Sequence, residues 1–222
     1  MEDTSDCTAG STGRQGTIAA TIIAAALVVD QVVKYLVKTG MYLGEQIHIT
    51  DWFYIVFVEN NGMAFGMELV GKLFLSIFRI VAIGFFIWYL IKILNKGFPK
   101  GYIACVSFIV AGAVGNLLDC IFYGRVFSES GFSADAVATL VPFGQGYAPF
   151  LYGKVVDMFY FPLWTWPDWV PLLGGGIFFS PVFNVADSCI TCGMIVLILF
   201  YARYLNAGFH WPSVEDKSKD DA

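Results

Sequence analysis

The chain has 222 residues, of which 57% are hydrophobic and only 14% are charged, and its mean hydropathy is +0.67. In a soluble domain about a quarter of the residues are charged, so this composition is that of an integral membrane protein. The formal net charge is −5 and no basic run is present, which argues against a nucleic-acid partner.

Four segments are apolar and long enough to cross a bilayer, for which about 20 helical residues are needed. They lie at about 17–37, 73–94, 101–123 and 185–205. We therefore expect an all-α integral membrane protein with four transmembrane helices and a small extracytoplasmic region, rich in strands or loops, at the outer membrane face. A four-span domain at 17–206 would lie between an N-terminal tail at 1–16 and a C-terminal tail at 207–222.

Basic residues predict the orientation of these spans. In a four-span path they fall on one side of the membrane: Arg14, Lys92, Lys96, Lys100, Arg203, Lys217 and Lys219. Because lysine and arginine concentrate in cytoplasmic segments, we expect both termini in the cytoplasm. The first span is followed by charged residues and by more spans, so it does not resemble a cleaved signal peptide.

Two longer segments then lie outside the membrane. Residues 40–70 contain the alternating stretch HITDWFYIVFVENNG, which predicts short strands that end in a turn at Asn60, Asn61 and Gly62. Residues 124–184 are rich in glycine, proline and aromatic residues. Their tryptophans suit the headgroup level of a membrane: Trp164, Trp166 and Trp169.

Several polar residues interrupt the spans. Asp30 and Lys34 have the spacing of helix neighbours one turn apart, so they can neutralise each other in a structural role. Arg79 stands within the second span, where a snorkelling or interior hydrogen-bonding role is the default interpretation.

In the third span, Gly112, Gly115, Asn116 and Asp119 form one stripe at spacings of three and four residues. Small residues permit close approach of helices. Packing would explain the glycines, but it would not explain an amide and a carboxylate on the same stripe.

The cysteines and histidines do not suggest disulfide bonds or a metal site. The five cysteines are an odd set and lie mostly in apolar runs, so a disulfide framework is not expected: Cys7, Cys105, Cys120, Cys189 and Cys192. The only histidines, His48 and His210, do not belong to ligand clusters. We expect no metal and no cofactor.

Asp157 and Asp187 carry the sharpest functional signal. Asp187 opens the fourth span, where a helix N-terminus favours negative charge, whereas Asp157 lies among apolar residues in KVVDMFYF. In a four-span path both fall at the outer interface. Two carboxylates that share a proton can act as base and acid, which suffices to activate water on an amide. Asn60, Asn116 and Asn184 could orient a peptide or the water by hydrogen bonding.

Two other functional classes compete with hydrolysis. A small proton- or ion-coupled transporter could use Asp30, Arg79, Asp119 and Asp187 as a relay, although no inverted repeat is apparent. A purely structural membrane subunit would leave Asp157 unexplained.

Five motifs in order resemble the bacterial lipoprotein signal peptidase family, also called signal peptidase II. They cover the chain from about 17 to 206: DQVVK at 30–34, NNGMAF at 60–65, GAVGNLLD at 112–119, GKVVDMF at 153–159 and FNVADS at 183–188. The resemblance implies an aspartic endopeptidase of the bacterial cytoplasmic (inner) membrane, with its active site near the outer face. It would remove signal peptides from prolipoproteins, cutting before a diacylglyceryl cysteine. Its partners would be those precursors and membrane lipid, and a monomer would suffice.

The resemblance also implies roles for individual residues. The catalytic pair would be Asp157 and Asp187. Supporting substrate residues would be Asn60, Gly62, Gly112, Asn116, Asn184 and Ala186, and structural charges would be Asp30, Lys34 and Asp119.

Two departures from the family pattern stand out. Cys120 occupies the place where the family usually has arginine after the G-N-x-x-D aspartate, and Arg125 is a candidate replacement. In addition, the frame YGRVFS at 123–128 precedes YGKVVD at 152–157. Only the second supplies a carboxylate, so we assign Asp157 to the pair and treat about 125–151 as an insertion.

Overall fold

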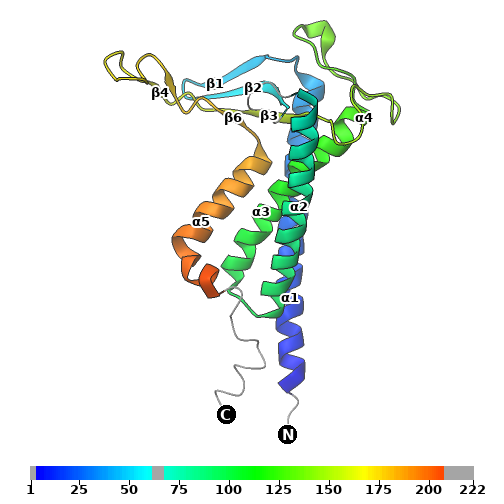
Figure 1. Cartoon of the computed structure of the whole chain (residues 1–222), viewed down its shortest axis with the longest axis vertical. Coiled ribbons are helices and arrows are strands. Elements are labelled where there is room, and N and C mark those ends of the chain that lie inside the picture. Colours follow the sequence, from blue (N-terminus) through cyan, green and yellow to red (C-terminus); the bar gives the residue numbers. More distant parts are fainter. Residues whose placement is uncertain (1–3, 62–67, 208–222) are drawn as a thin grey trace. The chain divides into compact units, whose positions relative to one another are not determined.

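A computed structural model describes residues 4–61 and 68–207. Figure 1 labels its elements, which run α1 (Thr4–Gly40), β1 (Gln46–Thr50), β2 (Phe53–Asn60), α2 (Glu68–Asn95), α3 (Lys100–Leu118), the π-helix η1 (Asp119–Tyr123), α4 (Gly124–Val126), the 3₁₀ turn η2 (Ala134–Ala136), β3 (Val155–Tyr160), β4 (Trp164–Thr165), β5 (Ile177–Phe178), β6 (Val182–Phe183) and α5 (Val185–Ala207).

Within these described residues, four helices are long and apolar enough to cross a membrane. Their membrane-competent parts are Gly13–Gly40, Lys72–Asn95, Lys100–Val126 and Val185–Leu205. The expected fold class, a helical membrane protein with a small β part, is confirmed. The helix α1 also continues on its N-terminal side through residues where the sequence suggested a tail.

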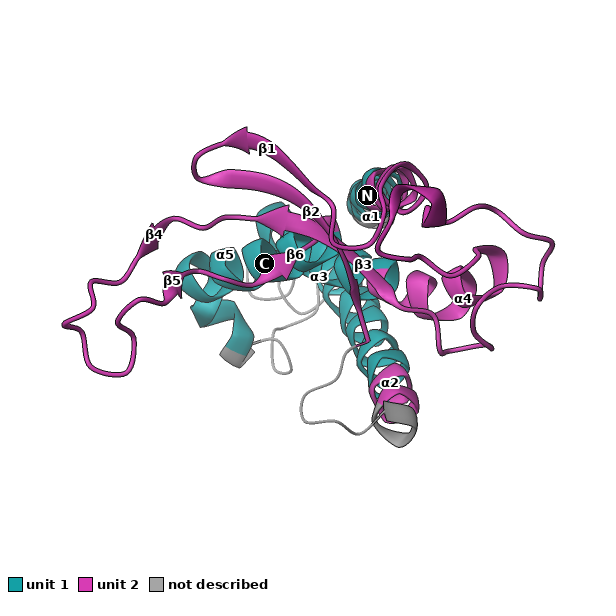
Figure 2. Ribbon diagram, turned by 90° about the horizontal axis from the view of Figure 1, so that it is seen from above, with its two compact units in different colours: residues 1–29, 78–115, 186–222 teal, residues 30–77, 116–185 magenta. Residues whose placement is uncertain are grey.

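The chain forms two compact units, which Figure 2 shows in different colours. The first, here the helical unit, comprises the chain up to residue 29, residues 78–115 and the chain from 186 onward. The second, here the sheet unit, comprises residues 30–77 and 116–185. The helices α1, α2 and α3 each contribute residues to both units.

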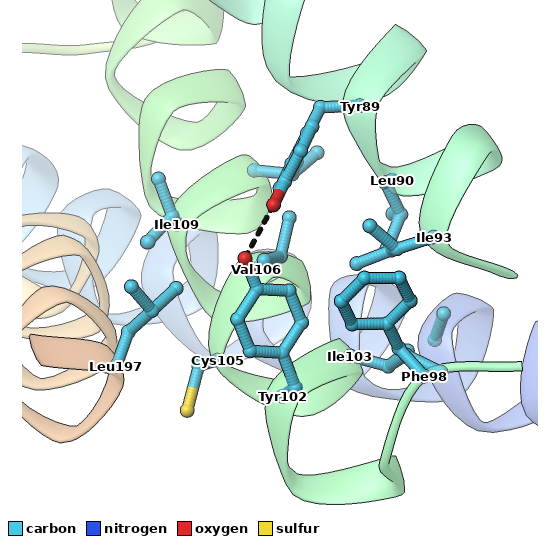
Figure 3. Packing of buried hydrophobic residues seen from close by; sticks show 12 residues of the cluster. Tyr89, Leu90, Ile93, Phe98, Tyr102, Ile103, Cys105, Val106, Ile109 and Leu197 are labelled. Carbon is cyan, nitrogen blue, oxygen red and sulfur yellow. Dashed lines mark hydrogen bonds between the residues drawn. The ribbon is translucent and has the colours of Figure 1, made fainter. Parts of the chain in front are cut away.

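The core of the helical unit is built around the link between α2 and α3. Figure 3 shows Ile93, Phe98 and Ile103 packed beside Tyr102, which is fully buried. The hydroxyl groups of Tyr89 and Tyr102 are hydrogen-bonded to each other, so the buried polar tip of Tyr102 has a partner. Burial of these rings and aliphatic chains fixes the turn that joins the two helices.

Close backbone contact joins α3 to α5 within this unit. A Cβ atom on Gly112 would lie 2.2 Å from the carbonyl oxygen of Ala186, and one on Gly193 would lie 2.9 Å from that of Cys105. Gly112 on α3 and Gly193 on α5 therefore allow a contact between the helices that no larger residue permits.

The sheet unit is centred on β3. Its four-stranded sheet has the order β1-β2-β3-β6, and all neighbouring pairs are antiparallel. The first four residues of β3, from Val155 to Met158, are all buried. The hairpin of β4 and β5 extends from this sheet (Figure 1).

The expected strands in 40–70 are present as β1 and β2, and β2 ends at Asn60. Gly62, the last residue of the expected turn, lies outside the described residues. The strands β3 and β6 were not predicted. They form because β-branched and aromatic residues at 155–160 pair with β2 on one side and with Val182 and Phe183 on the other.

The π-helix η1 holds the chain that leads into β3. The backbone N–H of Gly153 donates to the carbonyl oxygen of Cys120 at 2.9 Å. A Cβ atom on Gly153 would lie 2.1 Å from the carbonyl oxygen of Asp119, so only glycine permits this approach. The wide turn of a π-helix exposes carbonyl groups that a regular helix would use, and such turns are frequent at functional sites.

We predict that Gly112→Ala destabilises the protein by about 1–3 kcal/mol, because the added methyl group must displace the backbone of α5. Thermal unfolding of the protein in detergent measures the effect. Gly84→Ala in α2 is the matched control, since no atom lies within 4 Å of a Cβ there. An equal loss of stability in both variants would contradict close packing at Gly112.

Candidate active site

Asp157 lies buried on β3 between two asparagine side chains. Asn60 Nδ2 donates to Asp157 Oδ2 at 3.0 Å, and Asn184 Nδ2 donates to Asp157 Oδ1 at 2.6 Å. Asn60 is the last residue of β2 and Asn184 directly follows β6, so each strand beside β3 delivers one amide where it ends. Both carboxylate oxygens thus accept a hydrogen bond from an amide N–H group.

Asn184 connects this carboxylate to the end of α3. Its Nδ2 also lies 3.1 Å from Asn116 Oδ1 and 3.3 Å from the carbonyl oxygen of Val156, so these two acceptors share its second N–H group. Asn116 Oδ1 accepts a second hydrogen bond, 2.9 Å long, from Lys34 Nζ. A chain of polar side chains therefore runs from α1 through α3 to β3.

Lys34 is at the other end of that chain and is fully buried. Its Nζ lies 3.0 Å from Asp30 Oδ2 and 2.7 Å from Asp119 Oδ2. The expected pairing of Asp30 with Lys34 is present, but the ammonium is shared with Asp119, a contact that helix spacing alone does not reveal. Burial strengthens these attractions and makes an unpaired charge costly, so the three groups form one unit.

Asp119 also accepts a hydrogen bond from the backbone of β3, the strand that carries Asp157. Its Oδ1 accepts from Gln31 Nε2 at 3.0 Å, and its Oδ2 accepts a longer hydrogen bond, 3.4 Å, from the backbone N–H of Val156. Asp119 therefore joins α1 to the residue directly before Asp157.

Arg125 does not take the place of the family arginine. Its guanidinium lies 4.8 Å from the centre of the Phe143 ring, and no hydrogen bond or ion pair joins it to Asp119 or Asp157 in the described part of the chain. The candidate suggested by the sequence is thus wrong, because Arg125 packs inside the insertion. The positive charge beside Asp119 comes from Lys34 instead.

A second buried ionic cluster, here the Glu59 cluster, lies at the same end of β2, on the residue directly before Asn60. Glu59 pairs with Lys38 and with Lys154, the latter at 2.9 Å from its Oε2. Ser130 Oγ accepts from Lys38 Nζ at 2.7 Å and lies 3.2 Å from Glu59 Oε1. Burial would raise the pKa of the Glu59 carboxyl, but the Lys38 and Lys154 ammonium groups outweigh it and hold that pKa below its ordinary value.

The insertion at about 125–151 supplies part of the Glu59 cluster. Besides Ser130, it contributes Tyr147, whose ring centre lies 4.8 Å from Lys38 Nζ. The Tyr147 hydroxyl also accepts a 2.7 Å hydrogen bond from the backbone N–H of Lys154. The insertion therefore packs against β2 and against the residue directly before β3. It contains the short element η2 and overlaps α4.

The remaining predicted site residues lie in the helical unit or outside the described residues. Asp187 is half-buried in the first turn of α5, three residues after Asn184, where the helix N-terminus favours negative charge. Gly112 and Ala186 are in close contact with each other. Gly62 is outside the described residues.

The described side chains do not include a group of three or more His, Cys, Asp or Glu residues that could hold a metal ion. The side chains that donate to Asp157 are the amides of Asn60 and Asn184, a residue type that can also donate to a peptide.

Sequence reasoning missed Lys38, Glu59 and Lys154. A signal for Lys38 was available, since Asp30, Lys34 and Lys38 recur every fourth residue and therefore share one face of α1. Glu59 and Lys154 carry no comparable signal, because they meet only when β2 pairs with β3.

Comparison with known proteins identifies the family. The family model described as "Signal peptidase (SPase) II" matches residues 22–203. The chain belongs to the signal peptidase II family. It is a membrane peptidase of the bacterial inner membrane, and its family cleaves signal peptides from prolipoproteins. The transporter alternative receives no support.

Curated relatives and solved structures agree with this assignment. A lipoprotein signal peptidase of Porphyromonas gingivalis (strain ATCC 33277) is 51% identical, over 85% of this chain and 84% of the relative. One from Amoebophilus asiaticus (strain 5a2) is 37% identical, over 78% and 73%. A solved bacterial membrane enzyme is 26% identical with a TM-score of 0.56, covering 83% of this chain and 91% of that one.

We predict that Glu59→Gln destabilises the protein by about 3–5 kcal/mol near neutral pH, because it leaves buried lysines without their carboxylate. Since the folded-state pKa of Glu59 is below its ordinary value of 4.5, this stabilisation is complete above pH 4.5 and is lost as the pH falls through the folded pKa.

Melting temperatures of both proteins across this pH range measure the effect, and the difference between them should shrink in acid. Glu129→Gln is the control, because Glu129 is exposed and its oxygen lies 3.6 Å from Lys154. A difference that does not depend on pH would contradict the role of the Glu59 charge.

Proposed function

We propose that this peptidase cleaves diacylglyceryl-modified prolipoproteins directly before the lipidated cysteine, and that Asp157 and Asp187 activate the attacking water. The observation that carries this proposal is the pair of amide donors on Asp157. A buried carboxylate that accepts hydrogen bonds at both oxygens is suited to remain ionised and to act as a general base.

The reaction needs one proton acceptor and one proton donor. Asp157 takes a proton from water as the water oxygen attacks the scissile carbonyl carbon. Asp187 gives its proton to the nitrogen of the departing cysteine, and the C–N bond breaks. The products are the carboxyl terminus of the signal peptide and the free amine of the lipidated cysteine. Two carboxyl groups that share one proton divide these roles without a metal ion.

The supporting residues bind and orient the substrate in this proposal. Asn60 is exposed at the end of β2, so it can contact a peptide as well as Asp157. Gly112 and Ala186 pack directly against each other, so in this proposal they support the site by holding α3 close to α5. The family motif assigns Gly62 to the same supporting set. Asn116 and Asn184 are buried and act mainly by orienting Asp157.

The membrane supplies the remaining geometry. With both termini in the cytoplasm, Asp187 at the start of α5 lies at the outer interface. A diacylglyceryl cysteine is anchored at the same depth, because its acyl chains remain in the lipid. The signal peptide enters laterally as a helix, and one subunit is sufficient for this chemistry.

We predict that Asp157→Asn and Asp187→Asn each lower kcat by about 10²–10⁴-fold, because each removes one partner of the proton transfer. The assay is cleavage of a diacylglyceryl prolipoprotein by the purified, reconstituted enzyme. Asp51→Asn is the matched control, since the Asp51 side chain is fully exposed in the turn between β1 and β2, and it should retain full activity.

Undiminished turnover by both variants would refute the paired-aspartate mechanism. The same preparation with an unlipidated precursor tests the substrate class, and equal cleavage of the two precursors would contradict a requirement for the lipid.

We predict that Asn60→Ala lowers kcat by about 10–100-fold, since a hydrogen bond to a charged group contributes about 1.5–3 kcal/mol. Because Asn60 is exposed, the melting temperature should change little. Parallel kinetics and thermal unfolding check both statements, and an unchanged kcat would show that this donor does not assist Asp157.

A further inference from the structure

We propose that Lys34 is a positioning residue for the reaction, because through Asn116 it orients the Asn184 amide so that an N–H group faces Asp157. This inference rests on the proposed role of Asp157. It assigns a function in catalysis to a charge that the sequence suggested was structural.

The ammonium of Lys34 has a defined set of partners. It has three protons to donate and cannot accept a hydrogen bond. Its described acceptors are also three: Asp30 Oδ2, Asp119 Oδ2 and Asn116 Oδ1, at 3.0, 2.7 and 2.9 Å. All of these side chains are buried, so water cannot easily replace any of them.

This donor decides which way the Asn116 amide points. The oxygen and nitrogen ends of an asparagine amide have nearly the same shape, so an amide takes its direction from its partners. If the Asn116 amide turned over, its N–H₂ group would face the ammonium, and two donors would meet. Lys34 therefore keeps Asn116 Oδ1 directed toward itself and toward Asn184.

The direction of Asn116 is passed on to Asn184. With an oxygen as its neighbour, Asn184 presents Nδ2, and the same nitrogen donates to Asp157 Oδ1 at 2.6 Å. A reversed Asn184 would bring its carbonyl oxygen against the Asp157 carboxylate. The carbonyl oxygen of Val156 is a second acceptor, 3.3 Å from Asn184 Nδ2, and it also helps to orient the Asn184 amide, though more weakly. Loss of Lys34 should therefore weaken the orientation of Asn184 without abolishing it.

A useful variant must remove the ammonium without leaving buried charge behind. Lys34→Met alone would leave Asp30 and Asp119 buried without their partner, and this would destabilise the fold. The triple variant Asp30→Asn, Lys34→Met, Asp119→Asn is neutral throughout, and neutral replacements of whole buried ion clusters are often tolerated.

For the triple variant we expect kcat on a diacylglyceryl prolipoprotein to fall about tenfold, with KM within about threefold of the parent. The acid limb of the pH dependence of kcat should move to higher pH, because a carboxylate with poorer donors protonates more readily. The charged groups that the described contacts place along this path of side chains are Asp30 and Lys34 on α1 and Asp119 on η1, and Lys38, Glu59 and Lys154 form the neighbouring Glu59 cluster.

The matched control removes the other buried ion pair of the same unit. Lys38→Met with Glu59→Gln should lower the melting temperature, but it should leave the pH profile of kcat in place. If this control moves the profile as far as the triple variant does, a general structural effect explains both, and the inference is overturned.

Asn116→Leu provides a second test that leaves the charges paired. It should reproduce the loss in kcat and the shift of the pH profile, because it removes the same link. Adding it to the triple variant should cause little further loss, since both changes act on one path. Additive losses, or parental kinetics in a folded triple variant, would overturn the inference. Activity in Asp157→Asn would instead refute the proposed function.

Discussion

Lys34 lies fully buried between Asp30 and Asp119, and the rest of the sheet unit depends on this arrangement. Transfer of an ammonium and two carboxylates out of water is costly, so the cluster is tolerated only while its members stay together. That requirement ties α1 to the π-helix η1, and the hydrogen bond from the backbone N–H of Val156 to Asp119 ties both to β3. Asn116 extends the same contacts toward Asp157.

The strand β3 carries Asp157, the central residue of the candidate active site. It lies between β2 and β6, and each of these strands ends at an asparagine that donates to Asp157. Directly before Asn60 in the chain, Glu59 and its cluster fix β2 to Lys38 and to the insertion. The insertion is therefore packed against the strands that carry the site, and its contribution through Tyr147 and Ser130 is one of support.

Much of the fold could be predicted from the sequence, because its signals are local. Apolar runs of about 20 residues indicate membrane helices, and the alternation in HITDWFYIVFVENNG indicates the hairpin of β1 and β2. The strands β3 and β6 escaped prediction, since neither is regular in its alternation and each is defined by the strand beside it. The pairing of Lys34 with Asp30 was predicted from helix spacing, whereas Arg125 was assigned wrongly because distance along the chain does not report packing.

The sequence by itself determined that this is a four-span membrane protein of the signal peptidase II family, because hydropathy and the order of motifs are properties of the chain alone. It also named the aspartates and asparagines on which the proposed mechanism rests. Only the tertiary structure decided that Lys34 is shared with Asp119, and that Asn60 and Asn184 point their N–H groups at Asp157. These contacts join residues far apart in the chain, and hydrogen-bond direction depends on which atoms meet in space.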